Sequence, residues 1–149
     1  RNFVESFVKL IDCVRKVIGY NKTLSYTCYE GKYGFDSQIF ERSKSKIDYI
    51  QLMAYFDTTE EMEKLYDYYK FFFNDNIYIG VKAGEIKDQG TPINEVMTLC
   101  QWNKDKLGIM LWTFNRDNFS FTRQNEWLWC NTIKENLNKR EDCQCCIVC

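Results

Sequence analysis

The sequence predicts an α/β fold with about four parallel strands and outer helices, and two observations support this prediction. Helical and strand patterns alternate along the chain, which is typical of βα units joined by right-handed crossovers. Segment 107–114 is short, almost continuously apolar and bounded by polar residues, as expected of a strand covered on both faces. Four βα units make half of a (β/α)8 barrel, which needs about 250 residues. A small open sheet and a half-barrel completed by a partner are the alternatives.

The first part of the chain predicts two helices and two strands. The opening helix carries one apolar stripe, formed by Phe3, Phe7, Leu10, Ile11, Val14, Val17 and Ile18, at the spacing of a helix with one buried face. Gly19 ends this helix as a C′ glycine. Residues 23–29 and 47–56 are β-rich and predict the first two strands, with a short helix over 37–42 between them.

The second part continues the alternation. Thr58 and Glu61 form a capping box, which opens a helix with Met62, Leu65, Tyr66 and Tyr69 on its apolar face. Residues 77–83 predict the third strand. Thr91 and Pro92 fit the N-cap and first position of a helix, whose buried stripe is predicted as Ile93, Val96, Met97 and Cys100. The apolar strand described above follows, and the last helix carries Trp127, Leu128, Ile133 and Leu137.

Composition narrows the classes of function. The net charge of -1 argues against nucleic acid or an anionic membrane as the main partner. The absence of histidine removes the commonest zinc ligand and general base, and we expect no metal and no cofactor. No apolar run approaches the ~20 residues of a membrane span, and the residue pattern leads us to expect no signal peptide. Because Arg1 lies inside a helical pattern, we expect that a segment precedes it.

Trp112 is the main candidate for a binding residue. It ends the apolar strand 107–114 and is followed by the polar residues Asn115 and Asp117. Residues at the carboxyl end of a barrel strand point into the binding cleft, and an indole ring there suits the apolar face of a sugar. The alternative interpretation is a core tryptophan, because large aromatic side chains are mostly buried.

Three stretches resemble family 18 glycoside hydrolases, the group of the chitinases and endo-N-acetylglucosaminidases. Residues 48–57, 77–82 and 108–117 are similar to the sixth, seventh and eighth barrel strands of that family, and the likeness spans about residues 2–137 in order and spacing. The resemblance implies the carboxyl-terminal half of a (β/α)8 TIM barrel. We expect residues 1–138 to form this partial barrel and residues 139–149 to form a Cys-rich tail.

The resemblance also implies roles for individual residues in binding N-acetylglucosamine. Trp112 would stack under the sugar, Tyr55 would donate its hydroxyl to the acetamide oxygen, and Met53 would pack against the acetamide methyl. By strand alternation, Gln51 lies on the same inward face as Met53 and Tyr55. For Met53 and Gln51, packing of the barrel interior is an alternative of equal weight to sugar binding.

Three acidic residues complete the candidates. Asp57 stands one position beyond the aspartate of the family pattern, which would turn it to the other face of the strand. Glu85, just past the third strand, is placed for a cleft rim or for a solvated loop. Asp117 is an alternative cap for the turn after the last strand.

The catalytic motif of the family is missing from the chain. Its Asp-x-x-Asp-x-Asp-x-Glu run, whose Glu protonates the leaving oxygen, would lie just before Arg1. Three functions are therefore open: part of a hydrolase acting on N-acetylglucosamine polymers or N-glycans, a non-catalytic chitinase-like lectin, and a structural or interaction half-domain. The expected partners are N-acetylglucosamine oligomers or N-glycans, together with a missing amino-terminal half-barrel or a second copy.

The cysteines fall into two groups. Cys13, Cys28, Cys100 and Cys130 lie in predicted helices or strands, where buried free thiols are expected. The tail group consists of Cys143, Cys145, Cys146 and Cys149, for which zinc binding, lipidation of a C-a-a-X box and disulfides are open. Two glycosylation sequons, at 21–23 and 118–120, and the family resemblance favour a secreted or extracellular protein, in which disulfides would be the natural use.

Overall fold

Four parallel strands form one sheet in the described part of the chain, in the spatial order β1-β2-β3-β4. The computed structural model describes residues 3–28, 34–53, 55, 58–84 and 88–137. The strands are β1 (Ser25–Cys28), β2 (Tyr49–Leu52), β3 (Ile77–Lys82) and β4 (Gly108–Trp112). The helices are α1 (Phe3–Ile18), α2 (Asp36–Ser43), α3 (Thr59–Phe73), α4 (Ile93–Gln101), α5 (Phe119–Thr122) and α6 (Leu128–Leu137), with short 3-10 turns η2 (Lys44–Lys46) and η3 (Phe114–Arg116).

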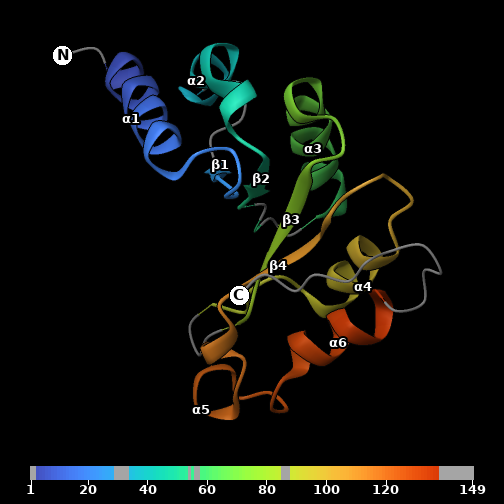
Figure 1. The fold of residues 1–149 in the computed structure, drawn as a ribbon. Coiled ribbons are helices and arrows are strands. Elements are labelled where there is room, and N and C mark those ends of the chain that lie inside the picture. Colours follow the sequence, from blue (N-terminus) through green and yellow to red (C-terminus); the bar gives the residue numbers. More distant parts are fainter. Residues whose placement is uncertain (1–2, 29–33, 54, 56–57, 85–87, 138–149) are drawn as a thin grey trace.

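The helices lie around one side of the sheet. Figure 1 shows α1, α2, α3, α4 and α6 following one another in an arc, with the strands inside it. Each strand pairs with its neighbour in chain order, so that Ile50 lies opposite Ile77 and Ile79 opposite Ile109. This arrangement confirms the predicted α/β class and the half-barrel arrangement of four parallel strands with outer helices.

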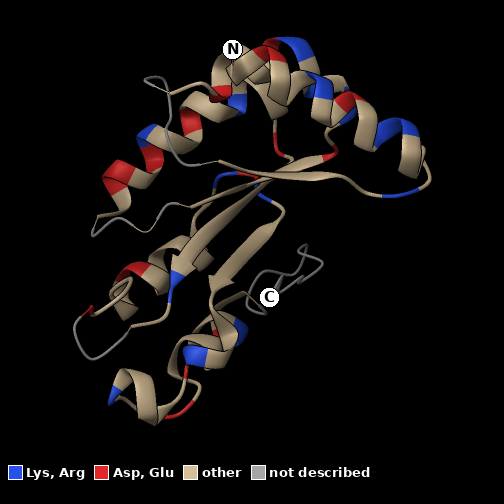
Figure 2. Cartoon of the chain, turned by 90° about the vertical axis from the view of Figure 1, so that its left-hand side faces the viewer, with Lys and Arg blue, Asp and Glu red and all other residues tan. Residues whose placement is uncertain are grey.

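Strand alternation divides the sheet into two faces. The helix-facing side chains form the core and are almost completely buried; they include Cys28, Ile50, Leu52, Ile79, Val81, Ile109 and Leu111. The alternate residues face the inner side of the curved sheet, where Gln51 and Met53 are half-buried. Figure 2 shows that charged residues gather on the helices and leave the strands almost free, and Lys82 is the one charged residue of the described strands.

Helix α1 buries a different stripe from the predicted one. The buried residues are Val4, Val8, Ile11 and Arg15. The predicted core positions Phe3, Leu10 and Val17 are 54%, 53% and 85% exposed, so this prediction was wrong for them. The helix is apolar over more than one face, and the described chain covers one of those faces. Gly19 does end the helix as predicted, with φ of 70° and a hydrogen bond to the Arg15 carbonyl.

The helix starts were predicted with mixed success. The Thr58 N-cap of α3 is confirmed, because the Thr58 hydroxyl accepts a hydrogen bond from Glu61 N. The Glu61 carboxylate accepts from the Thr58 hydroxyl rather than from the Thr58 amide of a full capping box. The cap of α4 was predicted one residue too early. Pro92 is the N-cap and has no side-chain cap bond, whereas the Thr91 hydroxyl accepts from Lys82 N at 3.0 Å. The Thr91 side chain therefore fixes the end of β3.

The buried face of α4 also differs from the predicted stripe. Val96, Leu99 and Cys100 are buried, while Met97 is 41% exposed. Leu99 is fully buried in the core shared with the helix-facing side of the sheet. Leu99 thus takes the place of Met97 on the buried face, because packing against α6 and the sheet decides which apolar residues of α4 are buried.

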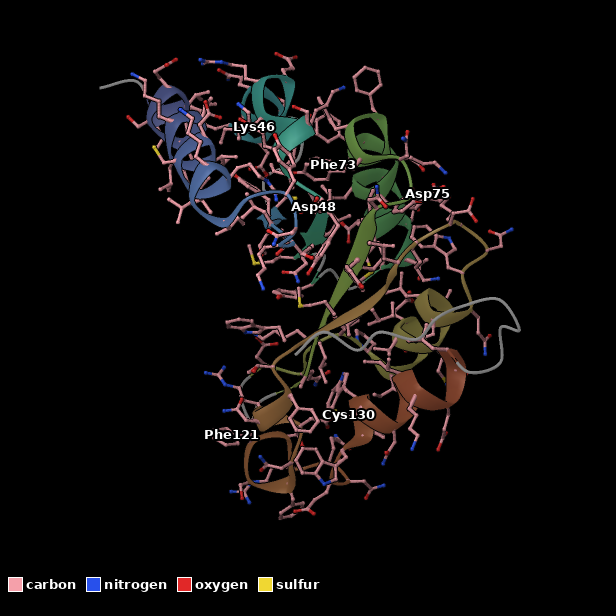
Figure 3. All side chains as sticks on the ribbon, in the orientation of Figure 1. Lys46, Asp48, Phe73, Asp75, Phe121 and Cys130 are labelled. Atoms are coloured by element: carbon pink, nitrogen blue, oxygen red, sulfur yellow. The ribbon has the colours of Figure 1, made fainter. Side chains whose placement is uncertain are left out.

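Arg15 connects α1 to the loops at the amino-terminal ends of β1 and β2. Its guanidinium is 3% exposed and donates hydrogen bonds to the carbonyls of Gly19, Lys22 and Lys46 and to Asp48 Oδ2, at distances of 2.5 to 3.0 Å. Figure 3 shows Lys46 and Asp48 at one end of the molecule and Phe121 and Cys130 at the other. This buried network therefore lies away from the carboxyl ends of the strands.

Candidate functional site

The carboxyl end of β4 presents Trp112 at the surface. Its side chain is 50% exposed, so Trp112 is not part of the core formed by the described residues. The strand register places Trp112 opposite Lys82, and Ala83 N donates to the Trp112 carbonyl at 2.8 Å. The Trp112–Thr113 peptide bond is cis. The indole ring lies at the end of β4, with half of its surface open to a ligand.

Tyr55 carries a buried hydroxyl that lacks a hydrogen-bond partner among the described residues. Burial raises the pKa of Tyr55 to about 12, so the phenol keeps its proton at neutral pH. A buried hydroxyl without a partner costs about 1–3 kcal/mol.

Met53 and Gln51 occupy the inner side of β2, as strand alternation predicted. Met53 follows the strand, is half-buried, and its amide donates to the Cys28 carbonyl at 2.9 Å. The Gln51 amide oxygen accepts from the Thr27 hydroxyl at 3.1 Å. This hydrogen bond connects the Gln51 side chain to the neighbouring strand β1, while Met53 lies closer to the carboxyl end of the sheet.

A glycine brings β2 and β3 close together beneath this end of the sheet. A Cβ atom on Gly80 would lie 2.2 Å from the Leu52 carbonyl oxygen and 3.0 Å from Met110 Cε. The Leu52 carbonyl does not allow this, since 2.2 Å to a backbone oxygen is far inside van der Waals contact, whereas Met110 Cε is the end of a flexible side chain and can move. The methyl group of Met110 therefore fills the inner side where the glycine lacks a side chain.

Lys82 is a candidate that the sequence analysis did not single out. It lies opposite Trp112 and forms an ion pair with Asp88. A hydrogen bond from Lys82 is the main cause that lowers the pKa of Asp88, followed by one from Gly90 N. The available signal was the single charge at the end of an otherwise apolar strand. The Asp88 partner lies beyond a loop, and the strand pattern gave no indication of it.

Asp117 has a structural position. It is 0% exposed, and its two carboxylate oxygens accept hydrogen bonds from Trp129 N at 3.2 Å and Cys130 N at 2.6 Å. Asp117 therefore caps the amino end of α6 from the preceding loop, which differs from the predicted cap of the turn after β4. The indole of Trp129 donates to the Thr91 carbonyl at 2.9 Å, which joins α6 to the loop after β3.

The loops after β4 carry further exposed aromatic rings. Phe114 and Trp127 stack with their centroids 4.9 Å apart, and Phe119 and Phe121 on α5 are 54% and 45% exposed. A separate hollow of about 420 Å³ lies between the loop after β3 and the start of α6, and its lining includes Gln89, Pro92, Gln124 and Trp129. Trp112 does not line this hollow, which is therefore distinct from the strand-end site.

Several sequence predictions fall outside the described residues. These are the candidate residues Asp57 and Glu85 and the four tail cysteines. In the described ranges, no group of three or more histidine, cysteine, aspartate or glutamate side chains could hold a metal ion. No helix within those same ranges is long and apolar enough to cross a bilayer.

The remaining cysteines are free thiols. Cys28 and Cys100 are buried as predicted, and burial raises the pKa of both, that of Cys100 to about 12. Cys13 is exposed and Cys130 half-buried, so the prediction of burial was wrong for Cys13. A raised pKa leaves the two buried thiols protonated and unreactive at neutral pH.

Comparison with known proteins gives one informative likeness. No family model and no curated protein matches the sequence. The fold matches a crystal structure of a mutant endo-beta-N-acetylglucosaminidase from Cordyceps militaris in complex with fucosyl-N-acetylglucosamine-Asn, with a TM-score of 0.73 and 15% identity. The match covers 93% of this chain and 53% of that one, so the chain spans about half the length of the fungal enzyme. This protein therefore has the fold of half of a TIM-barrel glycosidase.

Proposed function

We propose that this chain forms the sugar-binding half of a chitinase-like protein that recognises glycans containing N-acetylglucosamine. The observation that carries the proposal is Trp112, a half-exposed indole held at the carboxyl end of a barrel strand. Ligands of barrel folds bind at that face. The fungal enzyme with the same fold holds a fucosyl-N-acetylglucosamine-Asn ligand, which supports a glycan as the partner.

The chemistry of the neighbouring side chains fits an acetamido sugar. The protonated Tyr55 hydroxyl offers a hydrogen-bond donor to the acetamide oxygen. Met53 offers an apolar contact to the acetamide methyl, and Trp112 offers a flat surface to the ring. Asp57 and Glu85 remain candidates for the polar rim, and Gln51 for the deeper wall.

Hydrolysis is proposed only if an amino-terminal half-barrel supplies the glutamic acid that protonates the leaving oxygen. The alternatives are a non-catalytic chitinase-like lectin and a structural half-domain. The 149-residue chain alone should therefore not cleave N-acetylglucosamine oligomers or release N-glycans. Measurable turnover by the purified chain would contradict this expectation.

A secreted or extracellular location is part of the same proposal, and detection of the protein in the culture medium tests it.

Replacement of Trp112 by alanine tests the sugar-binding proposal. In the protein that carries this chain, the affinity for N-acetylglucosamine oligomers should fall by about 1–3 kcal/mol, the value of an apolar side-chain surface. The free energy of unfolding should change by much less than the ~3–5 kcal/mol of a core tryptophan, because the ring is half exposed. Calorimetric titration and a urea melt of the same variant measure the two quantities.

Phe119→Ala is the matched control. It removes an exposed aromatic ring of similar accessibility from α5, beyond the strand end. The control should leave oligomer affinity unchanged. If both variants lose affinity equally, or if Trp112→Ala keeps its affinity and shifts the melt by several kcal/mol, the proposed role of Trp112 is wrong.

A further inference from the structure

Lys82 occupies the middle of the proposed sugar site, because of the order of the strands. The sheet order places β3 between β2, which leads to Met53 and Tyr55, and β4, which ends in Trp112. Lys82 ends β3 directly opposite Trp112. Neighbouring strands are about 4.8 Å apart. A sugar that stacks on Trp112 and reaches Tyr55 with its acetamide group therefore has to pass over the end of β3.

The side chain of Lys82 belongs to the inner face of the sheet. Val81, the residue before it, is fully buried in the core under the helices, and successive residues of a strand point to opposite faces. Lys82 is half-buried, so its charge is partly removed from water. Charged residues otherwise gather on the helices (Figure 2). Packing does not require a charge on the inner face, but a ligand rich in oxygen atoms can use one.

The ion pair between Lys82 and Asp88 is not needed to close the loop after β3. Two hydrogen bonds already join the ends of that loop, from Lys82 N to the Thr91 hydroxyl at 3.0 Å and from Thr91 N to the Lys82 carbonyl at 2.9 Å. Gly90 also packs tightly there, since a Cβ atom on it would lie 2.5 Å from the Lys82 carbonyl oxygen. A partly exposed ion pair adds little to stability, so a structural role accounts poorly for this pair.

The ion pair holds the ammonium group of Lys82 in place and leaves it able to donate. An ammonium group has three donor hydrogens, and among the described residues Asp88 is its one hydrogen-bond partner. Asp88 is itself fixed, because its other carboxylate oxygen accepts from Gly90 N at 2.9 Å. Hydrogen bonds from a charged donor are stronger than neutral ones. A sugar hydroxyl beside Lys82 would therefore gain a strong contact with a side chain that is already ordered.

We propose that Lys82 is a specificity-determining residue of the strand-end site, which donates a hydrogen bond to a hydroxyl of the sugar on Trp112 and disfavours a sugar that carries an ammonium group there. Asp88 is the positioning residue that holds Lys82. The preferred ligand is a neutral N-acetylglucosamine oligomer, and the disfavoured one is its deacetylated, cationic form. The two charges act on a cationic sugar in opposite directions, because Lys82 repels it and Asp88 attracts it. The inference rests on the proposed sugar binding at Trp112.

Substitutions in the ion pair test this role in the protein that carries this chain. Lys82→Met should weaken the binding of N-acetylglucosamine oligomers about tenfold, by removing a hydrogen bond from a charged donor, and Lys82→Arg should retain most of the affinity. The preference for these oligomers over glucosamine oligomers of equal length should fall about fivefold in Lys82→Met and rise in Asp88→Asn. Calorimetric titration measures both quantities at a pH that keeps the glucosamine amines protonated. The lowered pKa of Asp88 favours its ionised form there.

The ion pair between Lys104 and Asp67 provides matched controls. Its side chains are 21% and 57% exposed, against 22% and 48% for Lys82 and Asp88. Lys104 lies between α4 and β4, before the strand and away from its carboxyl end. Lys104→Met and Asp67→Asn should therefore leave both oligomer affinities unchanged. Urea melts of all variants separate binding from stability, and Lys82→Met and Asp88→Asn should unfold close to the wild-type midpoint.

Three results would overturn the inference. The first is an unchanged affinity for N-acetylglucosamine oligomers in Lys82→Met. The second is a preference that moves in the same direction in Lys82→Met and Asp88→Asn, as expected if the pair only holds the loop. The third is an equal effect of Lys104→Met, which would assign the change to the overall charge of the protein. Loss of affinity in Trp112→Ala but not in Lys82→Met rejects the role of Lys82 alone, whereas a wild-type protein that binds neither oligomer rejects the proposed function as well.

Discussion

Replacing Arg15 by methionine should destabilise the fold. The substitution keeps the length of the side chain and removes hydrogen bonds to three backbone carbonyls and to Asp48 Oδ2. The guanidinium is 3% exposed, whereas Asp48 is 44% exposed and regains water when Arg15 is removed. The expected loss of unfolding free energy is therefore about 1.5–3 kcal/mol, the value of hydrogen bonds to a charged group.

Urea unfolding followed by circular dichroism measures this loss, with Lys16→Met as the control. Lys16 is the exposed neighbour on the same helix, so the control makes the same chemical change without breaking the network. Equal midpoints for the two variants would refute the reasoning. In the absence of urea, Arg15→Met should keep the affinity for N-acetylglucosamine oligomers, because the network lies at the amino-terminal ends of the strands.

The same network predicts a dependence on pH. The hydrogen bond from Leu24 N and then the bond from Arg15 lower the pKa of Asp48. A carboxyl whose pKa is lower in the folded state contributes stability above its ordinary pKa and loses it as the pH falls through the folded-state value. The difference between the wild-type chain and Arg15→Met should therefore shrink when the urea melts are repeated at progressively more acidic pH. A constant difference would contradict the pairing.

Three further changes have defined outcomes. Gly80→Ala should lower the free energy of unfolding by about 3 kcal/mol, because the alanine methyl group would clash with the Leu52 carbonyl. An unchanged urea midpoint would contradict this. Asp117→Ala should lower the free energy of unfolding by about 2–4 kcal/mol, because two α6 amides lose their acceptor. Asp117→Asn should recover part of this loss. Equal urea melts for the two variants would exclude a capping role. The raised pKa of Tyr55, about 12, predicts that the fold loses stability between about pH 10 and 12, because burial disfavours the ionised phenolate. Tyr55→Phe should lack this loss. Comparison with Tyr55→Phe in alkaline melts measures it.

Local patterns in the sequence were enough to predict the order of the elements. The Gly19 terminator and the Thr58 N-cap involve residues within one turn of each other, and both were confirmed. The parallel sheet followed from the alternation of helices and strands. The predicted strands were longer than the observed ones, since 47–56 became Tyr49–Leu52, because apolar residues continue past the last hydrogen-bonded pair.

Long-range packing accounts for the predictions that were wrong or missing. The stripe of α1 was misplaced because the helix is apolar on two sides and the sequence does not say which side its own chain covers. Asp117 reaches an amide 13 residues away, and no spacing rule relates a loop carboxylate to a helix start at that distance. The half-exposed side chain of Trp112 could not be predicted either, because the exposure of a strand-end residue depends on which other segments cover it.

The strand order β1-β2-β3-β4 has a consequence for the time course of folding. Because spatial order follows chain order, every pairing joins elements made one after the other during synthesis, and no strand has to enter between two that are already paired. Each pairing nevertheless spans a crossover helix, so it forms more slowly than the local contacts of a helical bundle. During synthesis, each new strand can pair with the edge strand that was made just before it, so the sheet can grow in the direction of translation.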